Sequence, residues 1–335
     1  MARDTNMNIR RRSGEVLRRA LAQHSPLFIL AGLCLVLAVI SPEFRQAKNL
    51  QQVGLRTCVV AIMAVGQILV ILTAGIDLSV GSVAAFSAVV AGLLMVDADL
   101  PVVVGILGGC ATGLVCGTIN GLLVTKGRIP PFIVTLGMMM VARGAALLAS
   151  GAVSIFSLPK AFRYLGGGQK IGEHGTAWIP ILIALTVACA IAVMLAHTRF
   201  GRALYATGGN LTGARLSGIA VDRVRTGAYM LSGLLAGLAG IMLAARTSVA
   251  DPNGAEGYEL DAIAACVMGG ASLMGGEGGA LGVLAGALIM NVLVNFCNLN
   301  DISVYWQRLL VGSLIVALVY YDSARKRRAG LQKDL

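Results

Sequence analysis

The chain has 335 residues, of which 57% are hydrophobic and 13% are charged, and its net charge is +11. Soluble domains are about 45–50% apolar and about 25% charged, so this composition excludes an ordinary soluble enzyme. Few aromatic residues interleave with the basic clusters, which argues against a nucleic-acid partner. Apolar runs recur along the whole chain and predict an all-α polytopic membrane protein.

About ten transmembrane helices are expected, some of them short or broken. They lie near 27–40, 57–74, 79–96, 102–125, 132–150, 178–196, 227–246, 260–274, 279–298 and 304–321. The chain then divides into a basic segment 1–26, a transmembrane domain 27–321 and a basic tail 322–335.

The distribution of basic residues predicts the orientation of these helices. Ten crossings place both termini on one side of the membrane, and the segments on that side hold 18 Lys or Arg against 6 in the opposite loops. Because basic residues remain on the cytoplasmic side, both termini are expected there. The basic segments can also contact anionic membrane lipid.

Glycine recurs every fourth residue in several of these runs. Gly105, Gly109, Gly113, Gly117 and Gly121 form one such stripe. Further stripes contain Gly233 and Gly237, and Gly278, Gly282 and Gly286. Residues four apart share one helix face, so each stripe predicts close packing against another helix. A second interpretation is that some of these faces slide during a transport cycle.

A carboxylate interrupts the apolar sequence at Asp77. Gly75 ends one run and Asp77 precedes the next, which suits an Asp that accepts backbone N–H bonds at a helix start. A direct contact with a transported solute is the equally weighted alternative, because the ends of broken helices are common substrate contacts in transporters.

A similar opening occurs later in the chain. Asp77-Leu78-Ser79 starts the third expected helix, and Glu259-Leu260-Asp261 starts the eighth. If the second to fifth and the seventh to tenth helices are inverted repeats, these two starts correspond to each other.

Other polar side chains fall within the apolar runs. Asn291 and Asn295 share a helix face, and Asn120 lies in the glycine-striped helix. With Asp77 and Ser79 they are the candidate lining of a solute pathway, and hydrogen bonds between helices are the alternative. Arg143 can pair with a carboxylate or extend to the membrane surface, and the second is favoured.

The longest connection on the cytoplasmic side spans 197–226. Gly208-Gly209 frees the backbone there, Asn210 can cap a helix, and Gly218 can close it after two turns over 211–217. So short a helix is unstable alone in water, so the membrane domain or a partner should hold it.

The sequence contains no recognisable catalytic or metal site. It lacks the GxxxxGK[ST] phosphate loop and HExxH, its seven cysteines form no CxxC pair, and its three histidines are scattered. The chain is therefore not expected to be an enzyme or to hydrolyse ATP by itself.

Five stretches resemble one protein family. They are "TAGIDLSVGS", "INGLLVTKGRIPPFIVTLGMMMVARG", "GRALYATGGNLTGARLSGI", "GYELDAIAACVMGGASLMGGEGGALG" and the basic tail. In this order they resemble the ribose-type, simple-sugar permeases of bacterial ABC importers, with similarity from about Pro26 to Arg328.

This resemblance implies partners and a docking segment. Two ATP-binding cassette ATPase subunits would carry ATP and Mg, a periplasmic or lipid-anchored binding protein would deliver the solute, and a second permease subunit, identical or different, would complete the channel. Residues 197–226 then correspond to the coupling loop, and its candidate residues are Arg202, Asn210, Leu211, Thr212, Gly213, Arg215 and Gly218. The family's Glu-Ala-Ala is replaced here by Leu211-Thr212-Gly213.

The resemblance therefore predicts a permease subunit of the bacterial inner membrane that imports a sugar or sugar-like solute by alternating access. No cofactor is expected in this chain. An ion-coupled secondary transporter of a small polar solute is the alternative, and Asp77 is its best ion-binding candidate.

Overall fold

The computed structural model describes residues 26–167, 170–171, 174–175 and 178–328. The predicted basic segment 1–26 and the end of the basic tail therefore lie almost wholly outside the described residues. The elements are the helix Pro26–Ile40, η1 (Glu43–Arg45), α2 (Ala47–Ile71), α3 (Val80–Val96), α4 (Val102–Thr125), α5 (Pro131–Ser150), α6 (Lys160–Arg163), η2 (Tyr164–Gly166), β1 (Lys170–Ile171), β2 (His174–Gly175), α7 (Trp178–His197), α8 (Arg199–Gly209), α9 (Leu211–Leu216), α10 (Val221–Thr247), α11 (Tyr258–Met268), α12 (Ala280–Leu299) and α13 (Val304–Arg328).

The described part of the chain is helical apart from a two-residue pairing of β1 with β2. Within it, six helices are long and apolar enough to cross a membrane: α2, α4, α5, α7, α10 and α12. The helix Pro26–Ile40 and α3 are apolar but shorter. The predicted all-α membrane protein is confirmed at this level.

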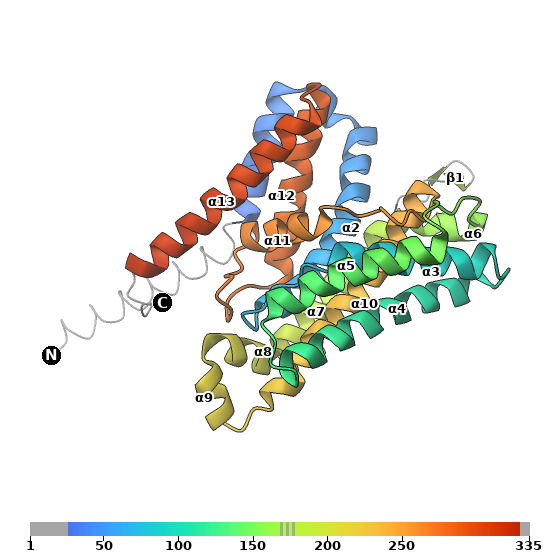
Figure 1. Ribbon diagram of the computed structural model, residues 1–335. Helices are drawn as coiled ribbons and strands as arrows, with labels where there is room; N and C mark the ends of the chain where they lie inside the picture. Colours follow the sequence, from blue (N-terminus) through green and yellow to red (C-terminus); the bar gives the residue numbers. More distant parts are fainter. Residues whose placement is uncertain (1–25, 168–169, 172–173, 176–177, 329–335) are drawn as a thin grey trace.

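The helices form two groups joined by α2 (Figure 1). In one group α3, α4, α5 and α10 run side by side, and in the other α12 and α13 lie beside the N-terminal helix. α7 packs against α2 and α12. Because α2 contacts α10 of the first group, α12 of the second group, and also α7 and α11, 83% of its apolar window is buried. In α4, α5 and α7 only 28% of the apolar window is buried, so these helices present most of their surface outward.

The helices α2 and α10 occupy comparable positions in this packing. α10 packs against α2, α3 and α4, and α2 packs against α10, α11 and α12. The two short helices α3 and α11 also begin against each other, because a Cβ on Gly81 would meet the carbonyl of Ala255 and the carboxylate of Glu259.

The glycine stripes are closely packed, as predicted. Gly113 and Gly233 face each other so that a Cβ on either would collide with the carbonyl oxygen of the other. The stripe of α12 meets α11 in the same manner, with Gly282 against Gly269 and Gly286 against Ala265. Glycine thus allows α4 and α10, and α11 and α12, to approach until their backbones touch.

The predictions for two glycine-rich segments are wrong. The eighth expected helix, 260–274, ends early: α11 spans Tyr258–Met268, because Gly270, Gly275, Gly276 and Gly278 adopt positive φ and break the helix. The glycine pair Gly208-Gly209, read as a flexible break, instead forms the last turn of α8.

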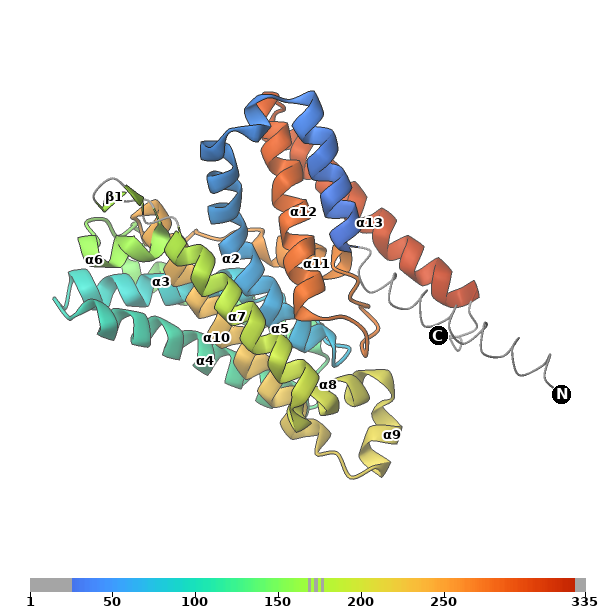
Figure 2. The same ribbon diagram turned by 180° about the vertical axis from the view of Figure 1, so that it is seen from behind.

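The connection 197–226 contains two helices at one end of the molecule. Figure 2 shows α7 running from the β1–β2 hairpin to α8 and α9, so the hairpin and the α8–α9 pair lie at opposite ends of α7. The expected helix over 211–217 is confirmed as α9.

Candidate functional site

A buried polar cluster surrounds the break between α2 and α3. The Asp77 carboxylate accepts hydrogen bonds from the backbone N–H of Ser79 at 2.9 Å, from its hydroxyl at 2.6 Å, and from the Ser232 hydroxyl of α10 at 3.3 Å. Asp77, Ser79 and Ser232 are each 1% exposed. The carboxylate thus fixes the start of α3 and connects it to α10, although Ser79 rather than Asp77 is the N-cap residue.

Two further side chains extend this cluster. The Asn120 amide of α4 donates to the Ser79 hydroxyl at 2.9 Å. The side-chain amide of Gln67 in α2 makes two hydrogen bonds with the backbone of Asp77. Its NH₂ group donates to the Asp77 carbonyl and its oxygen accepts from the Asp77 N–H, each at 3.1 Å. The cluster therefore joins α2, α3, α4 and α10, and three predicted pathway residues, Asp77, Ser79 and Asn120, come together in it.

Gln67 and Ser232 did not appear among the predicted residues. Both are polar residues buried within apolar helices, at 0% and 1% exposure. Their position in such runs was a detectable signal, because polar groups in a membrane interior need a partner. Their common partner, Asp77, could not be inferred from spacing, since Ser232 is 155 residues away.

The other two predicted pathway residues lie apart from this cluster. Asn291 and Asn295 share a face of α12, but the Asn291 amide donates to the Ala287 carbonyl one turn earlier, at 3.0 Å. Asn295 exchanges amide hydrogen bonds with Asn49 at 3.0 and 2.7 Å, which fastens α12 to the start of α2. The structure therefore does not gather the five predicted residues into one site.

Arg143, which was expected to extend to the membrane surface, reaches the connection between α10 and α11. Its guanidinium group donates to the carbonyl oxygens of Pro252 and Gly254 at 2.5 and 3.0 Å. These carbonyls belong to the connection that leads into α11, whose Glu259 lies against the start of α3. Arg143 of α5 thus holds the segment that places α11 against α3.

The helices α8 and α9 form the second candidate site. The Asn210 side chain caps α9 by accepting from the backbone N–H of Gly213 at 2.8 Å, as predicted. Gly218 closes α9 with φ +79°, and its N–H donates to the Arg215 carbonyl at 3.0 Å. Local sequence therefore fixes the shape of α9 at both ends.

The outer surface of this pair combines basic, polar and apolar side chains. Arg202, Leu211, Thr212 and Arg215 are exposed, whereas Ala214 faces inward and is buried. Leu216 was not predicted, yet its side chain is 85% exposed beside them. Leu216 thus adds an apolar side chain to the exposed surface of this pair.

Gly208 has a role that its sequence did not indicate. A Cβ at this position would collide with the carbonyl oxygen of Leu72 at the end of α2 and would lie 2.7 Å from the backbone nitrogen of Gly276. The end of α8 therefore rests directly on the backbone of two other segments.

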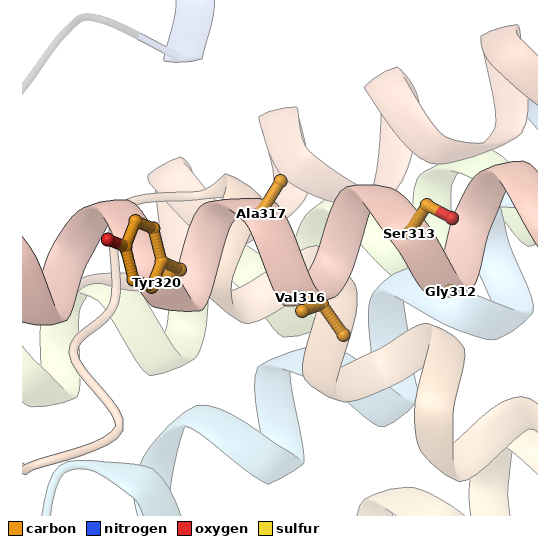
Figure 3. A pocket seen from close by; sticks show the side chains of 5 residues that line it. All are labelled: Gly312, Ser313, Val316, Ala317 and Tyr320. Atoms are coloured by element: carbon orange, nitrogen blue, oxygen red, sulfur yellow. The ribbon is translucent and has the colours of Figure 1, made fainter.

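An open hollow runs along α13 and is lined by Gly312, Ser313, Val316, Ala317 and Tyr320 (Figure 3). All five residues come from one face of a single helix, so the hollow does not enclose a small molecule. Among the described residues, no group of three His, Cys, Asp or Glu is arranged to hold a metal ion.

These features describe a polytopic membrane protein with broken helices, buried polar contacts at the breaks and a rigid helical pair at one end. The model of the family described as the permease component of branched-chain amino acid transport systems matches residues 49–319. The chain belongs to this family and is a transport subunit rather than an enzyme.

Similar proteins match along most of their length. The chain is 40% identical over 310 residues to the ribose import permease protein RbsC of Escherichia coli (strain K12), covering 91% of this chain and 95% of that protein. It is 42% identical over 306 residues to RbsC of Bacillus subtilis (strain 168), covering 90% and 92%. It is 35% identical over 301 residues to the D-allose transport system permease protein AlsC of Escherichia coli (strain K12), covering 90% and 91%. No solved structure matches the chain.

Proposed function

We propose that the chain is the membrane subunit of an ATP-driven importer that carries a sugar or sugar-like solute into the cytoplasm by alternating access. The observation that carries this proposal is the exposed, capped α8–α9 pair of a transport subunit that has no phosphate loop of its own. Such a subunit needs an external source of energy and a rigid surface to receive it. The names of its relatives, a ribose import permease and a D-allose transport permease, support a sugar as the solute.

The proposed partners are those that this function requires. Two ATP-binding cassette ATPases, with their ATP and Mg, would dock on Arg202, Asn210, Leu211, Thr212, Gly213, Arg215 and Gly218 of two permease subunits, identical or different. Exposed Leu216 supports this surface, since an apolar side chain gains free energy when a partner covers it. A periplasmic or lipid-anchored binding protein would deliver the solute on the opposite side.

The proposed topology has ten crossings in the bacterial inner membrane, with both termini cytoplasmic. The distribution of Lys and Arg supports this orientation. The proposed inverted repeat relates α2–α5 to α10–α13. It is supported by the comparable contacts of α2 and α10 and by the start of α3 beside the start of α11.

For the solute pathway we propose the polar cluster at the start of α3, containing Asp77, Ser79 and Asn120, in a conformer in which α3 and α10 separate. The buried Oδ1 of Asn120 supports this, because it has no hydrogen-bond partner among the described residues. Asn291 and Asn295 of α12 are separate candidates for the same pathway. An ion-coupled cycle through Asp77 is less well supported, since Ser79 and Ser232 already bind both of its oxygens.

The test is reconstitution of the permease in proteoliposomes with the ATPase and binding protein encoded beside it. Uptake of labelled ribose or D-allose is compared with uptake of labelled leucine, with and without ATP. The proposal predicts ATP-dependent uptake of a sugar and no ATP hydrolysis by the permease alone. Substantial hydrolysis by the lone chain, uptake driven by an ion gradient without ATP, or uptake of leucine only would contradict it.

A further inference from the structure

Three backbone segments meet at the C-terminal end of α8. The backbone N–H of Gly276 donates to the carbonyl of Leu72 at 3.1 Å, which connects the end of α2 to the loop between α11 and α12. Gly208 of α8 fills the space beside this hydrogen bond, with no room for a Cβ. A Cβ on Gly275 would lie 2.9 Å from the Ala74 backbone nitrogen and 3.1 Å from the Gly208 Cα. We call these contacting residues the junction: Leu72, Gly208, Gly275 and Gly276.

Tyr205 adds a directed contact to the junction. It precedes Gly208 by three residues, so the two lie on the same face of α8. Its hydroxyl donates to the carbonyl of Gly278 at 2.7 Å, and its ring is half-buried against the main hydrophobic core. The loop that leads into α12 is therefore held by α8 both through its backbone and through one side-chain hydrogen bond.

The segments that meet α8 are both breaks in the transmembrane helices. Residues 72–79 separate α2 from α3, and residues 269–279 separate α11 from α12. Ala74, Gly275, Gly276 and Gly278 all have positive φ, so the backbone follows a defined path there that few other residues could adopt. Because packed elements of this kind move as units, a displacement of α8 is transmitted to both breaks together.

We infer that Tyr205 and Gly208 are positioning residues that transmit movement of the α8–α9 pair to both helix breaks at once. This inference rests on the proposed function, because the movement would come from an ATPase docked on α9. Tyr205 lies on the inner side of the pair and is not part of the docking surface, so its loss should separate ATP hydrolysis from transport.

The experiment uses the complete reconstituted importer and the variant Tyr205→Phe, which removes only the hydroxyl. Loss of one part-buried hydrogen bond predicts roughly a three- to ten-fold fall in solute transported per ATP hydrolysed. The ATPase should still co-purify and hydrolyse ATP. Tyr164→Phe in η2, at the other end of α7, is the matched control and should keep the wild-type ratio.

A second pair of variants tests the backbone contact. Gly208→Ala introduces a methyl group against Leu72 and Gly276, whereas on Gly209 the same methyl group would meet no heavy atom of the described residues within 4 Å. Gly208→Ala should lower transport per ATP at least as much as Tyr205→Phe, and Gly209→Ala should not change it.

The inference is overturned if Tyr205→Phe keeps the wild-type ratio. It is also overturned if transport and hydrolysis fall together because the ATPase no longer binds, since Tyr205 would then support docking or folding. Failure of the proposed function is seen separately, in the wild-type chain, as absence of ATP-dependent uptake. Thermal unfolding of the purified variants shows whether Gly208→Ala folds, and Tyr205→Phe tests the same connection if it does not.

Discussion

The Asp77 carboxylate and the Ser79 hydroxyl lie 2.6 Å apart, with both residues almost completely buried at the point where α3 begins. The same carboxylate also accepts from the Ser79 backbone and from Ser232 of α10. A buried acidic group thus supplies the hydrogen-bond acceptors that the start of a broken helix cannot take from water when it is buried.

Asp77→Ala should destabilise the protein strongly. It leaves three buried donors without an acceptor, at a cost of about 1–3 kcal/mol for each group. Asp77→Asn keeps one acceptor oxygen and should cost less. Thermal unfolding of the detergent-purified chain measures both, with exposed Asp97→Ala as the control. Equal unfolding temperatures for Asp77→Ala and Asp97→Ala would show that the cluster does not stabilise the start of α3.

Gly113→Ala should disrupt the contact between α4 and α10, because its methyl group would collide with the carbonyl of Gly233. Overpacking of this kind costs about 1–3 kcal/mol, and more where backbones must separate. Gly137→Ala in α5 is the matched control, since its methyl group would meet no heavy atom of the described residues within 4 Å. The yield of monodisperse protein on size-exclusion chromatography is the measurement. A normal yield for Gly113→Ala would contradict the packing described for the stripe.

Leu216→Ala should weaken docking of the ATPase without changing the stability of the permease alone. The side chain is 85% exposed in the isolated chain, so its removal has little effect there. Its burial by a partner would be worth about 1.5–3 kcal/mol, or roughly ten-fold or more in affinity. Co-purification at graded ATPase concentrations measures the effect, and Ser217→Ala is the neighbouring control. Unchanged affinity would remove Leu216 from the proposed surface.

Arg143→Ala should release the segment that leads into α11. Two hydrogen bonds from a charged donor are lost, each worth about 1.5–3 kcal/mol. Both bonds come from one nitrogen, Nη1, so Arg143→Lys, whose ammonium group also carries several donors on a single nitrogen, should recover part of this. Limited proteolysis within 251–257 measures the release, and exposed Arg308→Ala is the control. Equal cleavage rates in all variants would show that Arg143 does not hold the segment.

The sequence predicts the continuous helices well and the interrupted ones poorly. The helix expected at 102–125 is observed as Val102–Thr125, because length and hydropathy define a simple crossing. The expected start of the second helix, at residue 57, is ten residues late, since α2 begins with a polar turn at Ala47. Hydropathy does not register such an extension.

At the candidate sites, the predicted local structure is confirmed where the interaction is local in sequence. Asn210 and Gly218 define α9 through contacts within a few residues, so the pattern was sufficient. Asn295 pairs with Asn49 across 246 positions, and Gly208 contacts Leu72 and Gly276 through backbone alone. Contacts of this kind carry no periodicity or motif, so only the folded chain reveals them.

The mutual contact of Gly113 and Gly233 also limits how this protein can change shape. With the carbonyl of each glycine filling the notch left by the other, α4 cannot rotate about its own axis or shift by a turn without first parting from α10. Helices locked in this way travel as one rigid piece. Opening and closing must therefore take place at other, less closely packed contacts between helices. A distance probe spanning α4 and α10 should report the same separation in every nucleotide state.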